Sequence, residues 1–391
     1  MNASFDVVIV GGGVTGAAVG YGLAKRGVKT CLVDAVPTFS RASRANMGLI
    51  WCQSKALGCP QFVRWGFASS RAYGKLAAEL KELSGIDTGY APTGGIIPCL
   101  GEAELEARAQ FIEKLRAETE DGTYPASVLS RKELEGMLPK VPFGPEVSGG
   151  IWSDMDGYVD PLHLMFAFRK SFVRLGGTLF AGERVSEVKP SGKGYTVVCG
   201  GRTLECGKAV LAAGLGVRKL AAQLGTDIPV FPNKSQVMLL ERIPADVLPI
   251  PLLGIARTFG GTVMIGAAHE NMGMDRRLTP EVLAANAQWA VRVWPELERK
   301  RILRFWTGLR VWPKDAYPIY DRIPGHENAF IFAMHSAVSL AAILEQALPD
   351  YVMGKPLPPD GAIFGLSRFA GGGSGFQGSA ASSPHAEAPN K

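Results

Sequence analysis

The feature that most constrains the fold of this chain is a glycine motif close to its N-terminus. A continuous apolar run covers residues 5–10, Gly11, Gly13 and Gly16 follow with G-x-G-x-x-G spacing, and an Ala-rich helical pattern covers residues 14–26. The first glycine permits a tight turn, the second lets the backbone approach a pyrophosphate, and the third lets the helix pack against the strand. This order of strand, turn and helix predicts a dinucleotide-binding unit in a buried parallel sheet.

An acidic residue ends the second apolar run of the same unit. The run covers residues 30–33, and Asp34 follows it directly. A carboxylate at this position accepts hydrogen bonds from a ribose and repels a 2′-phosphate, which favours FAD or NAD over NADP. The alternative for the motif on its own is a glycine-rich turn in another α/β fold.

The rest of the chain alternates between helical and strand-like patterns. Helices are expected at residues 61–85, 102–118, 162–175 and 279–294, the last with Thr279 as its N-cap, and strands at residues 183–189, 195–199, 208–212 and 329–333. From Pro229 to Gly266, strand-like runs separated by turns indicate an antiparallel sheet. The expected fold class is α/β, with an α+β second lobe: a Rossmann-type cofactor domain with a parallel sheet, and a substrate domain of an antiparallel sheet with helices.

This fold divides the chain into interleaved segments. The cofactor domain is expected to contain residues 1–88, 146–228 and 306–369, and the substrate domain residues 89–145 and 229–305. The Gly-, Ala-, Ser- and Pro-rich tail at 370–391 is expected to be disordered.

Composition excludes several classes of function. The 391 residues carry a net charge of only +6, spread along the chain, so no nucleic-acid partner is expected. The six cysteines have neither C-x-x-C spacing nor the spacing of a metal site, which suits reduced thiols. Reduced thiols favour a cytoplasmic location, and any association of the protein with the membrane surface is expected to occur through partner proteins. The N-terminus does not have the pattern of a signal peptide. The apolar segment 329–348 contains His335, Ser336, Ser339 and Glu345, so it indicates a buried strand and helix rather than a membrane span.

Six segments carry a resemblance to a known family: DVVIVGGGVTGAAVGYGLAKRG, LVDA, SRASRANMGLI, DGYVDP, VLAAGLGVRKLA and GLRVWPKDAYPIYD. Through them the chain, from about residue 6 to residue 369, resembles the D-amino-acid oxidase-like (DAO) FAD-dependent oxidoreductases. The segments RANMGLIWCQSK and MHSAVSLAAILEQAL are most similar to the B-type flavin subunits of heteromeric opine oxidases, hydrogen cyanide synthase and D-hydroxyproline dehydrogenase. The resemblance implies FAD, oxidation of a C–N bond by hydride transfer to the flavin, and partner subunits that carry further flavin or iron–sulfur centres. Because no Cys or His stands at an attachment position, the FAD is expected to be non-covalent.

The motif and the resemblance together assign residues to FAD. The expected contacts are Gly11, Gly13, Val14, Gly16, Asp34, Ala35, Ser43, Arg44, Asn46, Gly48, Leu49, Val185, Ala213, Gly214, Gly308, His335, Ser336 and Ser339. Ser339 is expected to cap a helix that begins at Leu340, whose N-terminus the resemblance directs towards the flavin pyrimidine edge. The family's glycine-bearing H-S-G-H-G-I-T loop is here His335-Ser336-Ala337-Val338-Ser339, shorter and without glycine, which favours a dehydrogenase over an oxidase.

Arg310 is the expected anchor for the substrate carboxylate. It lies in Gly308-Leu309-Arg310, which matches the G-L-R strand of the family, and a guanidinium fork fits two carboxylate oxygens. The alternative role for Arg310 is an internal ion pair, for example with Asp315.

Five further residues are weaker candidates for the substrate site. Trp51, Gln53 and Lys55 follow the expected flavin loop at alternating positions, with core packing for Trp51 and solvent exposure for Lys55 as alternatives. Tyr158 lies in a turn before a helix, and His269 lies at a strand end that the family brings towards the active site; a structural role is the alternative for both.

These residues leave three functional hypotheses open. The first is a catalytic flavoenzyme that oxidises an amino acid, imino acid or opine within a heteromeric complex. The second is an FAD-holding electron-transfer or interaction subunit without its own turnover, which the altered 335–339 loop suggests. The third is an NAD-dependent dehydrogenase, which does not explain the resemblance of the C-terminal third to flavin-binding segments.

Overall fold

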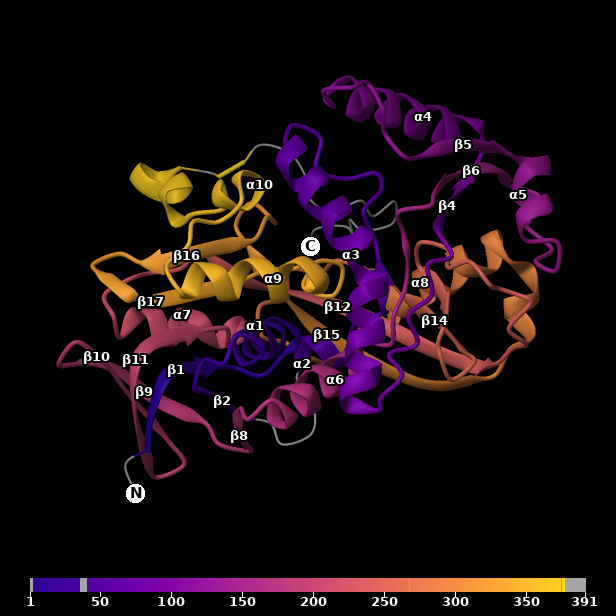
Figure 1. The fold of residues 1–391 in the computed structure, drawn as a ribbon. Coiled ribbons are helices and arrows are strands. Elements are labelled where there is room, and N and C mark those ends of the chain that lie inside the picture. The colour runs from indigo at the N-terminus through magenta and orange to yellow at the C-terminus, as the bar shows by residue number, and fades with distance from the viewer. Residues whose placement is uncertain (1–2, 36–40, 267, 374, 377–391) are drawn as a thin grey trace.

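The computed structural model describes residues 3–35, 41–266, 268–373 and 375–376. In this part of the chain the largest sheet has eight strands, with β16, β17, β11, β1, β2 and β8 adjacent in that order and β10 and β9 continuing from β11 (Figure 1). Its strands are β1 (Ala3–Val10), β2 (Thr30–Asp34), β8 (Thr178–Ala181), β9 (Val185–Ser191), β10 (Gly194–Cys199), β11 (Arg202–Leu211), β16 (Ile319–Ile323) and β17 (His326–Ala333). The central pairs β1–β2, β1–β11, β2–β8 and β11–β17 are all parallel.

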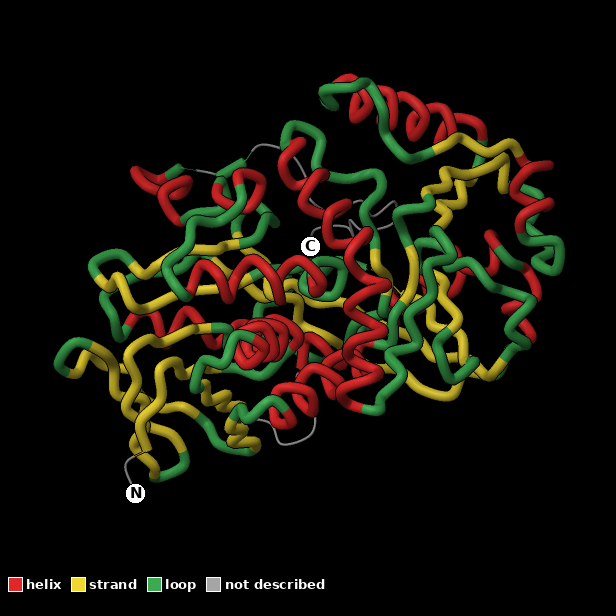
Figure 2. Tube along the Cα trace, viewed as in Figure 1, coloured by secondary structure: helices red, strands yellow, loops and turns green. Residues whose placement is uncertain are grey.

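The two faces of this sheet are covered by different elements (Figure 2). Because side chains alternate along a strand, Val7 and Ile9 of β1 join the core formed with the long helices, whereas Val8 and Val10 join the core formed with β9, β10 and α7. The helices of the first face are α1 (Val14–Lys25), α3 (Pro60–Ser84), α6 (Pro161–Arg174) and α9 (Ala341–Val352). Tight packing holds α1 against α9, since a Cβ on Gly22 would lie 2.1 Å from the Glu345 carbonyl oxygen.

A second group of strands forms the other lobe. The antiparallel order is β13–β14–β12–β15, and β4, β6 and β5 form a three-stranded sheet joined to it by a bridge between Ile96 and Leu252. The strands are β4 (Gly95–Leu100), β5 (Ser127–Ser130), β6 (Val147–Ser153), β12 (Val230–Arg242), β13 (Ile255–Arg257), β14 (Thr262–Gly266) and β15 (Ile302–Pro313), with helices α4 (Glu102–Ala117), α5 (Arg131–Met137) and α8 (Pro280–Val293). Trp294, which directly follows α8, is fully buried in the hydrophobic core of this lobe.

The remaining elements are short. They are α2 (Arg41–Arg44), β3 (Leu49–Ile50), β7 (Gly157–Tyr158), η1 (Gly214–Gly216), α7 (Val217–Ala222), η2 (Pro295–Arg299), α10 (Pro359–Ala362) and η3 (Leu366–Gly372). The β3–β7 ribbon precedes α6, where Asp160 caps the helix by accepting from the Leu162 and His163 amides, and Pro161 occupies the first turn.

The expected α/β class is confirmed, with a parallel sheet and an antiparallel second lobe. Segment 329–348 forms the end of β17 and the start of α9, and no helix in the described residues is long and apolar enough to cross a membrane. Thr279 is the N-cap residue of α8, but its side chain makes no cap bond because its hydroxyl bonds Glu270 and Lys234 instead. The division into domains stays a prediction; β6 lies in the second lobe although residues 146–228 were assigned to the cofactor domain. Of the expected tail at 370–391, residues 374 and 377–391 lie outside the described part, residues 370–372 belong to η3, and the Phe376 amide donates to Asp315 Oδ2 at 3.2 Å.

Candidate active site

The glycine turn has the close packing that its motif predicts. Gly11 has φ +105°, and a Cβ there would lie 2.4 Å from the Ala212 carbonyl oxygen. A Cβ on Gly16 would lie 1.8 Å from the Gly11 carbonyl oxygen. Gly13 is the N-cap of α1 and has no capping side chain, while the Ser43 hydroxyl accepts from the Val14 amide at 3.1 Å. The N-terminus of α1 therefore combines amide donors with a backbone that other residue types would obstruct, which fits a pyrophosphate.

Asp34 lies directly beside this turn. Its Oδ2 accepts from the Gly12 amide at 2.6 Å and from the Arg169 guanidinium at 2.7 Å. Arg169 also donates twice to the Gly12 carbonyl oxygen, at 2.8 and 2.5 Å. The carboxylate and the guanidinium are both buried, so the pair fixes the turn to β2 and α6.

The other expected FAD contacts before residue 335 lie on five further segments of the chain. Asn46 Oδ1 accepts from the Gly48 amide at 2.7 Å, and Gly48, with φ +81°, lies against Tyr158 and the Val159 carbonyl oxygen. A Cβ on Gly308 would lie 2.3 Å from the Ala45 Cβ, so the strand that carries Arg310 packs closely on the segment after α2. The remaining positions are Ala35, exposed after β2; Arg44, exposed at the end of α2; Leu49, in β3; Val185, which begins β9; Ala213, which precedes η1; and Gly214, which begins η1 with φ +59°.

The turn between β17 and α9 differs from its prediction in one respect. The N-cap of α9 is Leu340, and Ser339 does not cap the helix. Its hydroxyl instead accepts from the Trp51 amide at 3.0 Å and donates to the Leu49 carbonyl oxygen at 3.3 Å. Ser339 acts as a link to β3 because the helix begins at Ala341, one residue later than a Ser339 cap would require.

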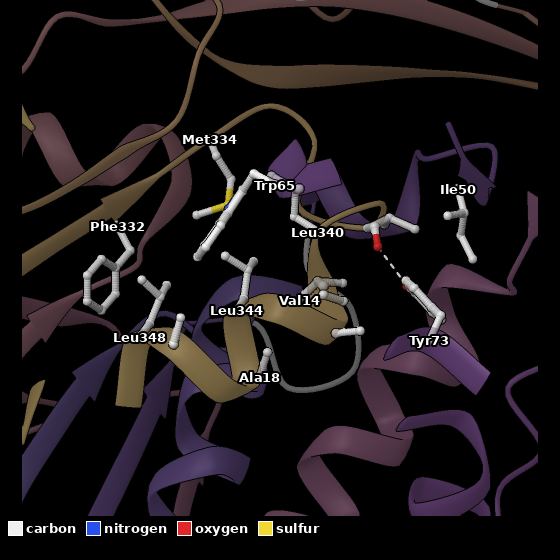
Figure 3. Packing of buried hydrophobic residues seen from close by; sticks show 14 of the residues in the cluster. Val14, Ala18, Ile50, Trp65, Tyr73, Phe332, Met334, Leu340, Leu344 and Leu348 are labelled. Carbon is white, nitrogen blue, oxygen red and sulfur yellow. Dashed lines mark hydrogen bonds between the residues drawn. The ribbon is translucent and has the colours of Figure 1, made fainter. Parts of the chain in front are cut away.

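The same turn is fixed from α3. The Tyr73 hydroxyl donates to the Val338 carbonyl oxygen at 2.6 Å, seen as the dashed line in Figure 3, and the Ser69 hydroxyl donates to the Ser339 carbonyl oxygen at 2.8 Å. At the start of the turn, Ser336 Oγ lies 3.3 Å from His335 Nδ1. A turn without glycine is thus held in place by side chains of another helix.

Arg310 lies within the second lobe, on β15, opposite Asn233 of β12. Its guanidinium donates to Asn233 Oδ1 at 3.0 Å, to the Ala268 carbonyl oxygen at 2.8 Å and to Ser235 Oγ at 2.9 Å. All three acceptors are neutral. The alternative ion pair with Asp315 is wrong, because Asp315 pairs with Arg368 at 2.8 Å. Burial lowers the Arg310 pKa to about 10, which leaves the side chain charged at neutral pH.

Two histidines and a tryptophan lie beside Arg310. His269 Nδ1 is 3.0 Å from Asn233 Oδ1, and the Trp312 ring lies between His269 (5.3 Å between ring centroids) and His335 (4.7 Å). Burial, followed by the charge of Arg310, lowers the pKa of His269 to about 3. The pKa of His335 is also well below its usual value, first because of burial. Both imidazoles are neutral, so Arg310 is the cation of this cluster.

The three candidates after β3 lie in a buried loop. The Trp51 indole Nε1 is buried without a hydrogen-bond partner among the described residues. Gln53 Nε2 donates to the Gly95 carbonyl oxygen and to Asp156 Oδ2, which gives Gln53 a structural role in the loop. Lys55 is only 8% exposed, so its expected alternative of a solvent-exposed side chain is wrong. Tyr158 is buried too, and its hydroxyl accepts weakly from the Phe259 amide at 3.4 Å.

Several residues of this region were not predicted. Arg169 and Asp156 are buried charged side chains, and Asn233 and Ser235 hold the Arg310 guanidinium. A signal was present for Arg169 alone, since it occupies a core-facing position among the apolar residues of α6. The partners on β12 depend on strand register, which one sequence does not reveal.

Comparisons with known proteins place this arrangement in a family. The model of the family described as "DAO: FAD dependent oxidoreductase" matches residues 6–344. The chain is 33% identical over 365 residues to the B-type subunit of opine oxidase from Agrobacterium tumefaciens (strain Ach5), which covers 93% of this chain and 97% of the relative. It is 28% identical to hydrogen cyanide synthase subunit HcnC of Pseudomonas aeruginosa, over 94% of this chain and 97% of that protein. The crystal structure of glycine oxidase from Geobacillus kaustophilus superimposes with a TM-score of 0.86 at 27% identity, over 95% of this chain and all of that one.

The glycine cradle, the N-terminus of α1 with its side-chain-free N-cap Gly13, and the acidic end of β2 fit the cofactor of this family, and the resemblance inferred from sequence is confirmed. The chain belongs to the DAO family of FAD-dependent oxidoreductases.

Proposed function

We propose that this protein oxidises the C–N bond of an amino acid, imino acid or opine, and that Arg310 binds the substrate carboxylate. One observation carries the proposal: a partly buried guanidinium whose hydrogen-bond acceptors in the described residues are all neutral. Burying a charge without a counterion is costly. A substrate carboxylate would supply the counterion, and its fork geometry matches the two terminal nitrogens.

The residues around Arg310 serve to position rather than to exchange protons. Asn233 and Ser235 hold the guanidinium from the neighbouring strand, and Asn233 also holds His269. FAD, when bound by the α1 turn and the 335–339 turn, supplies the hydride acceptor. Burial lowers the pKa of His269 and of His335, which leaves Arg310 as the cation that attracts the carboxylate, and the Trp312 ring packs against both imidazoles.

The relatives support this choice of substrate class. They are named as an opine oxidase, a glycine oxidase and an iminodiacetate oxidase, and all three names refer to amino-acid-like amines. The opine oxidase and hydrogen cyanide synthase relatives are also named as subunits, which supports a place in a heteromeric complex, with electrons leaving through partner subunits that carry further flavin or iron–sulfur centres. We propose this chain as the catalytic subunit of such a complex.

Anaerobic reduction tests the proposal. The FAD-loaded protein, alone and with its co-purifying partners, is mixed with glycine, sarcosine, D-hydroxyproline, D-amino acids and opines while its visible spectrum is recorded. Loss of the flavin absorbance with one of these amines supports the proposal. A yellow protein that none of them bleaches, with its partners present, supports instead an FAD-holding subunit without turnover.

A further inference from the structure

The exposed apolar side chains of this protein are concentrated in two segments of the second lobe. Of the ten large apolar side chains that are exposed in the described residues, six belong to these segments: Met272, Met274, Leu278, Ile302, Leu303 and Phe305. Their exposed fractions range from 38% for Phe305 to 61% for Met274. Apolar residues scattered singly on a surface are ordinary, whereas a group of this kind marks an interaction site.

The two segments lie against each other. The Thr307 hydroxyl, on β15, donates to the Arg276 carbonyl oxygen, in the loop between β14 and α8, at 2.7 Å. All residues from 301 to 305 are exposed, and so are those from 271 to 278 except Asp275, which is partly buried. Residues 271–278 and 301–305 together are called the β15 patch from here on.

The loop of the β15 patch is fixed at its base. Glu270, which is buried, accepts from Gln236 at 2.8 Å and from Thr279 at 2.9 Å. Lys234 pairs with Glu270 at 3.0 Å and donates to the Arg277 carbonyl oxygen at 3.2 Å. These contacts tie both ends of the loop to β12. Because ordering a loop on binding costs free energy, a base fixed in this way favours a preformed docking surface.

The patch also contains a free sheet edge. The strand order is β13–β14–β12–β15, and no strand of the described residues pairs with the outer edge of β15. The exposed start of this strand therefore offers backbone N–H and C=O groups beside apolar side chains, a combination that accepts a strand from another chain. A lipid surface would leave these backbone groups without hydrogen-bond partners, which is costly. The edge thus favours a protein over a membrane as the partner.

The charge of the patch distinguishes a different protein from a second copy of this chain. Arg276 and Arg304 are exposed, and neither has an acidic partner within the part of the chain that the structure describes. Asp275, the one acid in the sequence of the patch, already pairs with Arg277 at 2.8 Å. Two copies joined through this surface would bring two cationic patches together, whereas a partner with carboxylates would pair with the arginines.

We propose that the β15 patch is the docking surface for a different subunit, one that pairs a strand with the free edge of β15 and presents apolar side chains bordered by carboxylates. This inference rests on the proposed function, in which the chain works within a heteromeric complex, and it locates the contact. Asn271, at the start of the loop, accepts from Asn233, which also holds Arg310. A subunit on the patch therefore contacts the loop that leads away from the proposed substrate site.

Reconstitution from purified subunits tests the proposal. The tagged chain is isolated from its own organism, and the subunits that stay with it in a fixed ratio are identified by mass spectrometry and produced separately. Their dissociation constant from the FAD-loaded chain is measured by calorimetry at low and at high salt. Salt should weaken binding by on the order of 10-fold, because it screens the paired charges. Amide hydrogen exchange of residues 271–278 and 301–306 should slow when the complex forms.

Substitutions within the patch separate its apolar part from its charged part. Leu303→Glu and Met274→Glu should each weaken binding by on the order of 10- to 100-fold, because a carboxylate then faces an apolar surface. Arg304→Glu should weaken binding and remove most of its salt dependence. Val173→Glu, at a 48% exposed position on α6, and Lys132→Glu, exposed on α5, are the matched controls and should bind as wild type does. Flavin content and thermal unfolding show that each variant keeps the fold.

Other results would overturn the proposal. Unchanged binding by Leu303→Glu and Met274→Glu, with exchange slowed only outside the patch, would place the subunit on another surface. A chain that retains no other subunit but forms a dimer that Leu303→Glu dissociates would assign the patch to a second copy. Binding to phosphatidylglycerol vesicles that Leu303→Glu abolishes would assign it to a membrane. Failure of the proposed function is a different result: no amine would bleach the flavin of the assembled complex, whichever surface joins the subunits.

Discussion

Arg169 and Asp34 form a buried ion pair at 2.7 Å that encloses the Gly12 peptide, since the arginine binds its carbonyl oxygen and the aspartate its amide. The pair joins α6, β2 and the glycine turn at the position where FAD is expected. It also explains why residue 12 has no side chain: a Cβ there would lie 2.8 Å from Arg169 Nη2 and 2.9 Å from Asp34 Oδ2.

Arg169→Met should destabilise the fold and weaken FAD retention. Removing the guanidinium takes the cationic partner away from the buried Asp34 carboxylate, at a cost of about 3–5 kcal/mol. Urea unfolding of the apoprotein measures the stability, and flavin release on dilution measures the affinity. Lys170→Met, on the exposed side of the same helix, is the matched control and should alter neither. Wild-type stability in Arg169→Met would show that the pair is dispensable.

Gly16→Ala should prevent the glycine turn from closing. The added Cβ would lie 1.8 Å from the Gly11 carbonyl oxygen, a backbone atom that cannot move without separating β1 from α1. We expect a loss of bound FAD, read from the ratio of the flavin absorbance in the visible range to the protein absorbance in the ultraviolet. Gly136→Ala serves as control, because a Cβ at that helical position meets nothing within 4 Å, and it should retain FAD. Full flavin content in Gly16→Ala would contradict the close approach.

The sequence predicted the elements whose signals are local. The β1–turn–α1 unit has an apolar run, ordered glycines and a helix of small residues, and its observed bounds differ from expectation by one or two residues. The start of α6 was equally clear, since Asp160 and Pro161 form a cap and first turn.

The parts that could not be predicted depend on pairing between distant segments. Arg310 was identified from its strand motif, but its neutral partners Asn233 and Ser235 follow from the register of β12 with β15. Ser339 was assigned to its own helix because capping is a local signal, whereas Trp51, its actual partner, comes from the other end of the chain. The roles of the individual site residues stay predictions until they are measured.

Asp156 should make the stability of the protein fall as pH rises from about 4 to about 7. Burial raises the pKa of this carboxyl to about 7, above its value of 3.8 in the unfolded chain. Between these values the folded state holds a proton that the unfolded state has lost, so raising the pH favours unfolding. The unfolding free energies of wild type and Asp156→Asn are measured across this pH range. Their difference at each pH gives the contribution of Asp156, because the other titrating groups contribute equally to both proteins. Parallel pH profiles for the two proteins would contradict the raised pKa.

Arg310→Ala should strongly weaken substrate use and leave FAD bound. The guanidinium lies on β15 in the second lobe, is not among the expected FAD contacts, and is expected to contact the carboxylate of the substrate. Losing a charge-assisted, bidentate contact should raise KM and lower kcat/KM by at least about 100-fold, and Arg310→Lys should recover only part because a lysine lacks the fork. Rapid anaerobic reduction at several amine concentrations separates weaker binding from slower chemistry. Kinetics unchanged from wild type, in a variant with full flavin content, would remove Arg310 from the substrate site and favour the FAD-holding subunit.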